Sequence, residues 1–168
     1  PFYDASGTYA EPEAAAAYRY VGGEDTLAAL TSDAGLNGYT FIDSKDDFEA
    51  LAAGDVQTAR VVGIARTNST LQAAREDLPA ADTPSGMAFN DQVPDLATMS
   101  IGALNVLSQD EDGLFLMIEG GAVDWMGHGN NMPRYIEEQI DFNASVAAVI
   151  DWIETNSSWD ETLLIITA

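Results

Sequence analysis

The sequence has no cysteine, which excludes disulfides, thiolate nucleophiles and cysteine-based zinc clusters. No apolar run approaches the roughly 20 residues of a membrane-spanning helix. The N-terminal stretch PFYDASG has neither an initiator methionine nor the pattern of a signal peptide. The chain closes on TLLIITA, a run typical of a buried strand. From these two ends we expect an internal segment of a longer protein, truncated on both sides.

Positively charged residues are also few in this sequence. Six Lys and Arg face 28 Asp and Glu, which gives a formal net charge of −22, and Lys45 is the single lysine. Such a surface repels nucleic acid and anionic membranes, so we expect neither as a partner. The acids are dispersed among apolar residues, and we interpret them as a halophilic adaptation that keeps the protein hydrated in salt. An anionic substrate would then need bound metal to supply positive charge.

With 168 residues, 46% of them hydrophobic, the chain is long enough for about one domain. Residues 1–38 are weakly patterned, and we interpret them as a surface excursion or a family-variable insertion, with short helices over 11–21 and 24–35. Residues 39–168 carry clear periodicity and are predicted to belong to one core.

The first half of this core alternates strands and helices. The pattern predicts strands over 39–43 and 60–65, and a helix between them that Ser44 caps and Gly54 ends. Residues 67–94 form a long connection rich in proline. A second helix over 95–109 begins at Asp95. Its apolar face is predicted to contain Leu96, Met99, Ala103, Val106 and Leu107.

The last third continues the alternation. Apolar runs over 114–118 and 163–167 predict buried strands, and residues 133–154 predict an amphipathic helix between them. Its inward face is predicted to contain Ile136, Ile140, Ala147, Ile150 and Ile153. Strands that are apolar on both faces and alternate with helices indicate an α/β fold, a parallel-type sheet sandwiched by helices and incomplete in this chain.

The stretch FLMIEGGAVDWMGHGNN, residues 115–131, places ligand-type side chains directly behind a predicted strand. In parallel sheets ligands gather beyond the carboxyl ends of strands, where Glu119 lies. Asp124 and His128 are four residues apart, so a helical turn would direct both to one side. Carboxylate and imidazole suit zinc, and a carboxylate alone suits magnesium. The alternatives are a solvent-facing Glu119, a helix-capping Asp124 and a surface histidine.

A calcium loop overlaps the same residues. In an EF-hand, positions one, three, five, six and twelve would be Ser108, Asp110, Asp112, Gly113 and Glu119. Against it, positions seven to eleven would be the apolar run LFLMI, and a glycine pair would begin the exiting helix. We therefore interpret SQDEDG as an acidic turn between helix and strand.

The same stretch, with the helix IEEQIDFNASVAAVIDWIE and the strand TLLIITA, closely resembles the metal-binding segment of alkaline phosphatases. YTFIDSKDDFEALAAGD, VVGIA and DLATMSIGALNVLSQDEDG resemble the part that precedes it. The resemblance covers residues 39–168 and extends to the enzymes of marine or halophilic bacteria. It implies an alkaline-phosphatase-like α/β core and hydrolysis of phosphate monoesters through a phosphoserine intermediate.

By this resemblance the cofactors are two Zn²⁺ and one Mg²⁺, which stabilise the attacking and leaving oxygens. Glu119 matches the magnesium ligand, and Asp124 and His128 match two ligands of one zinc. Trp125 occupies a variable position expected to border the phosphate pocket, with ordinary packing as the alternative. The resemblance also implies a periplasmic or secreted location and small phosphomonoester substrates. The partners it implies are the remainder of the same polypeptide and, in a homodimer, a second copy of the protein.

The chain departs from the family in what it lacks. A catalytic zinc needs about three protein ligands, yet His128 is the single histidine. No segment resembles the nucleophilic serine, which is expected upstream, because Ser44 is better explained as a helix cap. We therefore predict that the chain alone is inactive. The alternatives are a metal-dependent phosphodiesterase or sulfatase of the same superfamily, and a non-catalytic acidic metal-binding module.

Overall fold

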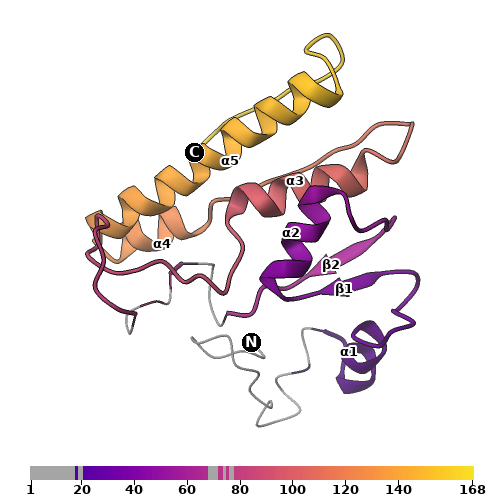
Figure 1. The fold of residues 1–168 in the computed structure, drawn as a ribbon, viewed down its shortest axis with the longest axis horizontal. Helices are drawn as coiled ribbons and strands as arrows, with labels where there is room; N and C mark the ends of the chain where they lie inside the picture. The colour runs from indigo at the N-terminus through magenta and orange to yellow at the C-terminus, as the bar shows by residue number, and fades with distance from the viewer. Residues whose placement is uncertain (1–17, 19–20, 68–71, 74, 76–77) are drawn as a thin grey trace.

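A computed structural model describes residue 18 and residues 21–67, 72–73, 75 and 78–168. Figure 1 shows the elements in chain order. They are α1 (Glu24–Leu30), β1 (Thr40–Ile42), α2 (Lys45–Ala53), β2 (Val61–Gly63), α3 (Leu96–Leu107), α4 (Ala122–His128) and α5 (Met132–Asn156). The fold class is α/β, as the sequence predicts.

The strands β1 and β2 form a parallel pair in which Phe41 lies beside Val62, and α2 connects them. Ser44 accepts a hydrogen bond from the Asp47 amide, and the Asp47 carboxylate accepts one from the Ser44 amide, which completes a capping box. Gly54 ends α2 in the left-handed conformation, at φ 79°. The predicted strand–helix–strand order and both helix signals are confirmed.

The helix α3 packs between α2 and α5 (Figure 1). The Asp95 carboxylate accepts a hydrogen bond of 2.7 Å from the Thr98 amide, so the predicted cap is confirmed. The predicted apolar face is wrong at Leu107, which is 36% exposed, whereas Leu104 is buried. The reason is that α3 has neighbours on two sides: Val106 joins a cluster with α2, and Leu104 joins another with α5.

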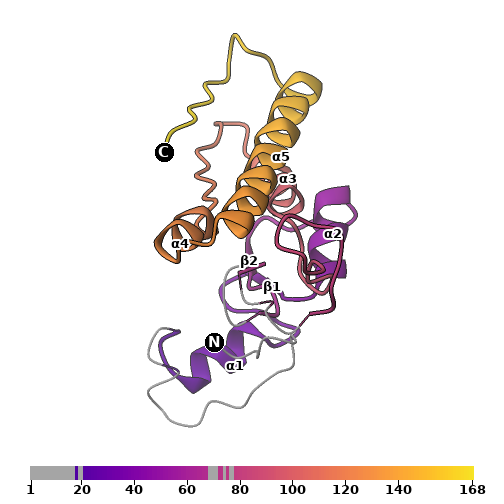
Figure 2. The same cartoon turned by 90° about the vertical axis from the view of Figure 1, so that its left-hand side faces the viewer.

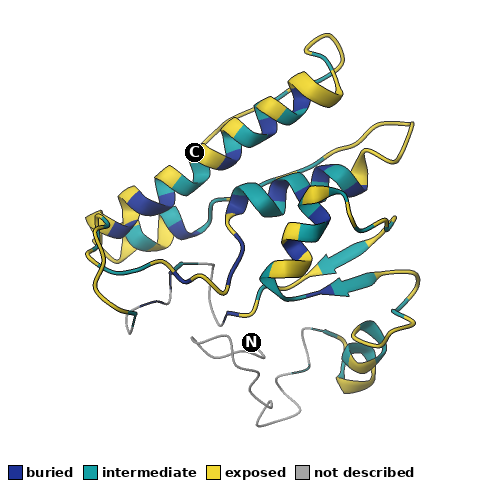
Figure 3. Cartoon of the chain, viewed as in Figure 1, coloured by how far each residue is buried: buried dark blue, intermediate teal, exposed yellow. Residues whose placement is uncertain are grey.

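The buried face of α5 differs from the predicted one. Ile136 and Ile140 are 43% and 57% exposed, and Ala147 is exposed as well. Of the five residues predicted to face inward, only Ile153 is buried, and Ile150 is partly buried. The buried side chains are Arg134, Glu137, Glu138, Ser145, Val149 and Ile153 (Figure 3). The N-terminal half of α5 therefore packs through polar groups, which an apolar periodicity cannot reveal.

The apolar runs 114–118 and 163–167 are extended but pair with no strand among the described residues. Leu116, Ile118 and Leu164 pack against the cluster of α3 and α5, while Phe115, Met117 and other alternate side chains are exposed. Figure 2 shows both runs on the same side of these two helices. The prediction of buried strands is therefore corrected. One face packs as in a strand, and among the described residues no ladder partner covers the other face.

The N-terminal region is described in part. The helix α1 confirms the second helix expected before residue 38, and the first, over 11–21, lies mostly outside the described residues. The division into an excursion and a core stays a prediction. Within the described ranges, none of the helices combines the length and the apolar character that are needed to cross a bilayer.

Candidate functional site

The helix α4 brings Asp124 and His128 together, as their spacing predicts. The His128 Nε2 lies 3.5 Å from the Asp124 Oδ1, and their side chains are 82% and 73% exposed. Asn130 takes a positive φ of 50° after α4, and Asn131 caps α5 through the Arg134 amide. This turn ends α4 directly after the histidine, so the imidazole and the carboxylate stay accessible on one helical face.

Glu119 lies at the end of the extended apolar run and is exposed. A Cβ built on Gly120 would lie 2.8 Å from the Phe142 ring, so this glycine permits the close approach of the run to α5. Among the described residues, no group of three or more His, Cys, Asp or Glu side chains is placed to hold a metal ion. The structure thus unites Asp124 and His128 and leaves Glu119 outside such a group.

The overlapping calcium loop is not formed. Ser108 is the C-cap of α3, the residues before Glu119 are extended, and α4 begins at Ala122 rather than directly after the loop. No described group of carboxylates can hold an ion there. The interpretation of SQDEDG as a turn between helix and strand-like run fits this arrangement, with Gly113 at a φ of 97°.

Two further sequence assignments can be placed. The Ser44 hydroxyl lies 3.2 Å from the Asp47 amide that it caps, which accounts for this serine structurally. Trp125 lies on α4 between Asp124 and His128 in sequence and is 50% exposed. This residue is therefore half open to solvent, and its assignment to a phosphate pocket stays a prediction.

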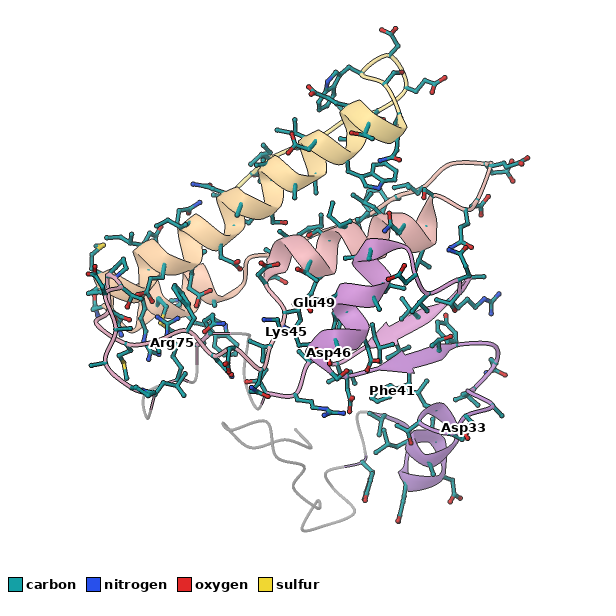
Figure 4. All side chains as sticks on the ribbon, in the orientation of Figure 1. Asp33, Phe41, Lys45, Asp46, Glu49 and Arg75 are labelled. Carbon is teal, nitrogen blue, oxygen red and sulfur yellow. The ribbon has the colours of Figure 1, made fainter. Side chains whose placement is uncertain are left out.

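Sequence reasoning missed a buried polar cluster between α5 and the long connection. Arg75 and Glu137 form an ion pair whose side chains are 1% and 2% exposed. The Ser85 amide donates a hydrogen bond of 2.8 Å to the same carboxylate. Burial alone would raise the pKa of Glu137, but these bonds from Ser85 and Arg75 outweigh it and lower the pKa. Figure 4 labels Arg75 on the connection.

Arg134 supports this cluster from the start of α5. It is 3% exposed and donates a hydrogen bond of 2.7 Å from Nη1 to the Ala73 carbonyl. Two of the six cations of the chain lie here, and a buried carboxylate such as Glu137 needs a compensating charge or hydrogen bonds. The partners themselves could not be predicted, because Arg75 and Glu137 are 62 residues apart.

Two neighbouring acids on α5, Glu138 and Asp141, have raised pKa values, whereas that of Glu137 is lowered. Burial raises the pKa of Glu138 to about 7, and the Asp141 carboxylate adds to the rise. Burial and the Asp95 carboxylate also raise the pKa of Asp141, against a hydrogen bond from the Leu96 amide. These two acids therefore lie in a negative region, and among the described residues neither forms an ion pair with a cation.

The family model for alkaline phosphatases matches residues 6–168. The chain is similar to alkaline phosphatase 3 of Bacillus subtilis, with 37% identity over 76 residues, which are 45% of this chain and 16% of that protein. It is similar to the alkaline phosphatase of Escherichia coli, with 34% identity over 92 residues, 55% of this chain and 19% of that protein.

A relative with longer coverage is the repressible alkaline phosphatase of Saccharomyces cerevisiae, with 26% identity over 168 residues. The match covers 95% of this chain and 27% of the yeast protein. The chain thus spans only a minor part of each of these relatives. Because the family model covers nearly the whole sequence, the chain belongs to the alkaline phosphatase family.

Proposed function

We propose that this chain forms part of the active site of a metal-dependent phosphatase that hydrolyses phosphate monoesters through a phosphoserine intermediate. Asp124 and His128 would be two ligands of one zinc, and Glu119 would be a magnesium ligand. The observation that carries the proposal is the pair on α4, in which carboxylate and imidazole lie 3.5 Å apart and open to solvent.

The donor set fits the proposed ions in part. Asp124 and His128 supply the oxygen and nitrogen that zinc accepts, and Glu119 supplies an oxygen suited to magnesium. A catalytic zinc takes about three protein ligands, and no described group of three is present. We infer that the remaining ligands and the nucleophilic serine come from the rest of a longer polypeptide, in a periplasmic or secreted protein.

When bound, two zinc ions and a magnesium ion would stabilise negative charge on the attacking and leaving oxygens and supply the positive charge that this acidic chain lacks. The contribution of the protein itself is to hold the three proposed ligands in position. The helix α4 holds the two ligands one turn apart, and the packing of Leu116 and Ile118 against α3 and α5 positions the run that leads to Glu119. Rigid elements of this kind keep ligands in a fixed geometry.

The proposal is tested by assaying the chain with zinc, magnesium and p-nitrophenyl phosphate, beside the longer polypeptide. We expect no turnover by the chain and clear turnover by the longer protein, which His128→Ala would abolish. Turnover by the chain alone would contradict a shared site. A longer protein that cleaves phosphodiesters or sulfate esters in preference to monoesters would favour another member of the same superfamily.

A metal titration separates the enzyme from a non-catalytic acidic module. We expect zinc to bind the chain weakly, with Asp124→Asn and His128→Ala each reducing the affinity. Glu154→Gln is the matched control, because it removes one exposed carboxylate at the far end of α5. A chain that prefers calcium and is insensitive to His128→Ala would contradict the assignment of the zinc ligands.

A further inference from the structure

A cavity of about 380 Å³ lies apart from α4, where the first turns of α2, the start of α3, the N-terminal half of α5 and the long connection meet. We call it the acidic pocket. Figure 4 labels Lys45 and Glu49 on α2 and Arg75 on the connection. The lining carboxylates are Glu49, Asp91, Asp95, Glu137, Glu138 and Asp141, and the apolar lining residues are Phe89, Val93 and Pro94.

The cations near the pocket already have partners within the chain. Lys45 lines it and lies 3.6 Å from Glu49 on the same helix. Arg75 binds Glu137 and stacks with its guanidinium carbon 4.5 Å from the centre of the Phe89 ring. Arg134 donates to the Ala73 carbonyl behind the cluster. Two of the six lining carboxylates, Glu49 and Glu137, are thus paired with a cation, and the other four leave a net negative charge in the cavity.

Glu138 is the group that points to a ligand. The residue is 7% exposed and lines the pocket, and the causes of its pKa shift include burial and neighbouring charges but no hydrogen bond. Its carboxylate neighbours Asp141 and Glu137 repel its charge, and Arg75 and Arg134 reduce that repulsion only in part. A carboxylate buried in this way calls for either a proton or a cationic partner.

We propose that the acidic pocket binds a small organic cation, a primary ammonium with a short alkyl body, whose charged head pairs with Glu138 and Asp141. The cavity has the size of a small-molecule site and greatly exceeds one ion. The described residues offer no group of three ligands for a metal. Phe89, Val93 and Pro94 supply the apolar wall that an alkyl body would contact.

The chemistry predicts a pH dependence for this binding. Burial raises the pKa of Glu138 to about 7, and that of Asp141 is also raised. The protonated carboxyls attract a cation weakly, and their ionised forms attract it strongly, so affinity rises with pH across neutrality. Other groups facing Glu138 across the pocket are Lys45 and Glu49 on α2, Asp91 on the connection and Asp95 at the start of α3.

The test is calorimetric titration of the full chain with n-butylammonium chloride at constant ionic strength. We expect saturable binding at one site at pH 8, several-fold weaker binding at pH 6, and a loss of about tenfold or more in Glu138→Gln. Asp151→Asn is the matched control, because it removes one charge from an exposed position of the same helix and should leave the affinity unchanged.

Neutral n-butanol tests whether the charge matters, and calcium chloride tests for a metal site. Equal affinity for butanol and butylammonium, displacement of butylammonium by micromolar calcium, or equal loss in both variants would overturn the proposal. The pH dependence in the unaltered chain provides a second measurement that does not depend on how Glu138→Gln folds. Affinity that is constant or falls between pH 6 and 8 would also overturn it.

Discussion

Two adjacent glutamates on α5 show how far burial alone is from determining the charge of a side chain. Glu137 and Glu138 are both buried. Glu137 accepts hydrogen bonds from Arg75 and the Ser85 amide, and its pKa is lowered. Glu138 has carboxylate neighbours and, within the described part of the chain, no such donor, and its pKa is raised to about 7. The two residues should therefore respond to the same substitution in opposite ways.

For Glu137→Gln we predict strong destabilisation. The change leaves the Arg75 guanidinium buried beside a neutral amide, and breaking a buried ion pair by removing one partner typically lowers the free energy of unfolding by about 3–5 kcal/mol. Urea unfolding at pH 7 measures the loss. The exposed pair of Lys45 and Glu49 is the control, since Glu49→Gln should change stability by less than about 1 kcal/mol. Equal effects of the two substitutions would contradict the buried pair.

For Glu138→Gln we predict a gain that grows with pH. Because the pKa of Glu138 is about 7 in the folded state and 4.5 ordinarily, the folded state holds a proton that the unfolded state releases between these values. The wild-type free energy of unfolding therefore falls as the pH rises through this window, by about 3 kcal/mol in total. Unfolding curves of the two proteins from pH 4 to 8 should diverge in this direction. A constant difference would contradict the raised pKa.

For the helices and strands, the ends that depend on residues close in sequence were predicted correctly. The faces that are buried by residues far away in sequence were not. Ser44, Gly54 and Asp95 fix the ends of α2 and α3 through groups that are close in sequence, so those ends could be predicted. The buried face of α5 could not, because it is turned toward Arg75 and Ser85 on a distant connection. Ile136 and Ile140 lie two residues from Glu138, which places them about 200° away around a helix.

The extended runs show the same limit. Period-two alternation is present in 114–118, where Leu116 and Ile118 pack inward and Phe115 and Met117 point outward. The sequence predicted strands here from continuous apolar runs of strand length, which are a local property. A place in a sheet needs a neighbouring strand for hydrogen bonding, and that depends on a partner that no local pattern in this chain specifies.

Asn105 links three helices, and we predict that Asn105→Ala lowers the free energy of unfolding by about 1–3 kcal/mol. Its Nδ2 donates to the Leu51 and Ala52 carbonyls at 3.2 and 2.8 Å, and its Oδ1 accepts from the Trp152 Nε1 at 3.1 Å. Thermal unfolding measures the change. Asn143→Ala, at an exposed position of α5, is the control and should stay within about 0.5 kcal/mol. Equal losses would contradict the role of Asn105 as a link.

At the scale of the whole molecule, charge dominates. A net charge of −22 on 168 residues produces self-repulsion that salt screens. We therefore predict that the melting temperature rises steadily as KCl is increased from low concentration to about 1 M, where the Debye length is about 3 Å. Sucrose at matched osmolality is the control for solute exclusion, which stabilises the folded state without screening charge, so KCl should raise the melting temperature by more. Stability that falls with added KCl would contradict the interpretation of the acidic surface.

Only the part of the candidate metal site whose residues are close in sequence could be predicted. Asp124 and His128 are one helical turn apart, so their meeting on α4 followed from spacing. Glu119 is positioned by the packing of an extended run against α5, with Gly120 against Phe142, and no spacing rule gives its distance from the pair. The acidic pocket was not predicted, because its walls come from segments far apart in sequence: α2, the connection with the start of α3, and α5.

The central claim is that Asp124 and His128 bind the same zinc ion, and the single histidine makes a direct measurement possible. When ¹⁵N-labelled chain is titrated with zinc, we expect a saturable shift of one His128 imidazole nitrogen, which is weaker in Asp124→Asn and unchanged in Asp151→Asn. Imidazole resonances that do not move at millimolar zinc, or that move equally in all three proteins, would contradict it.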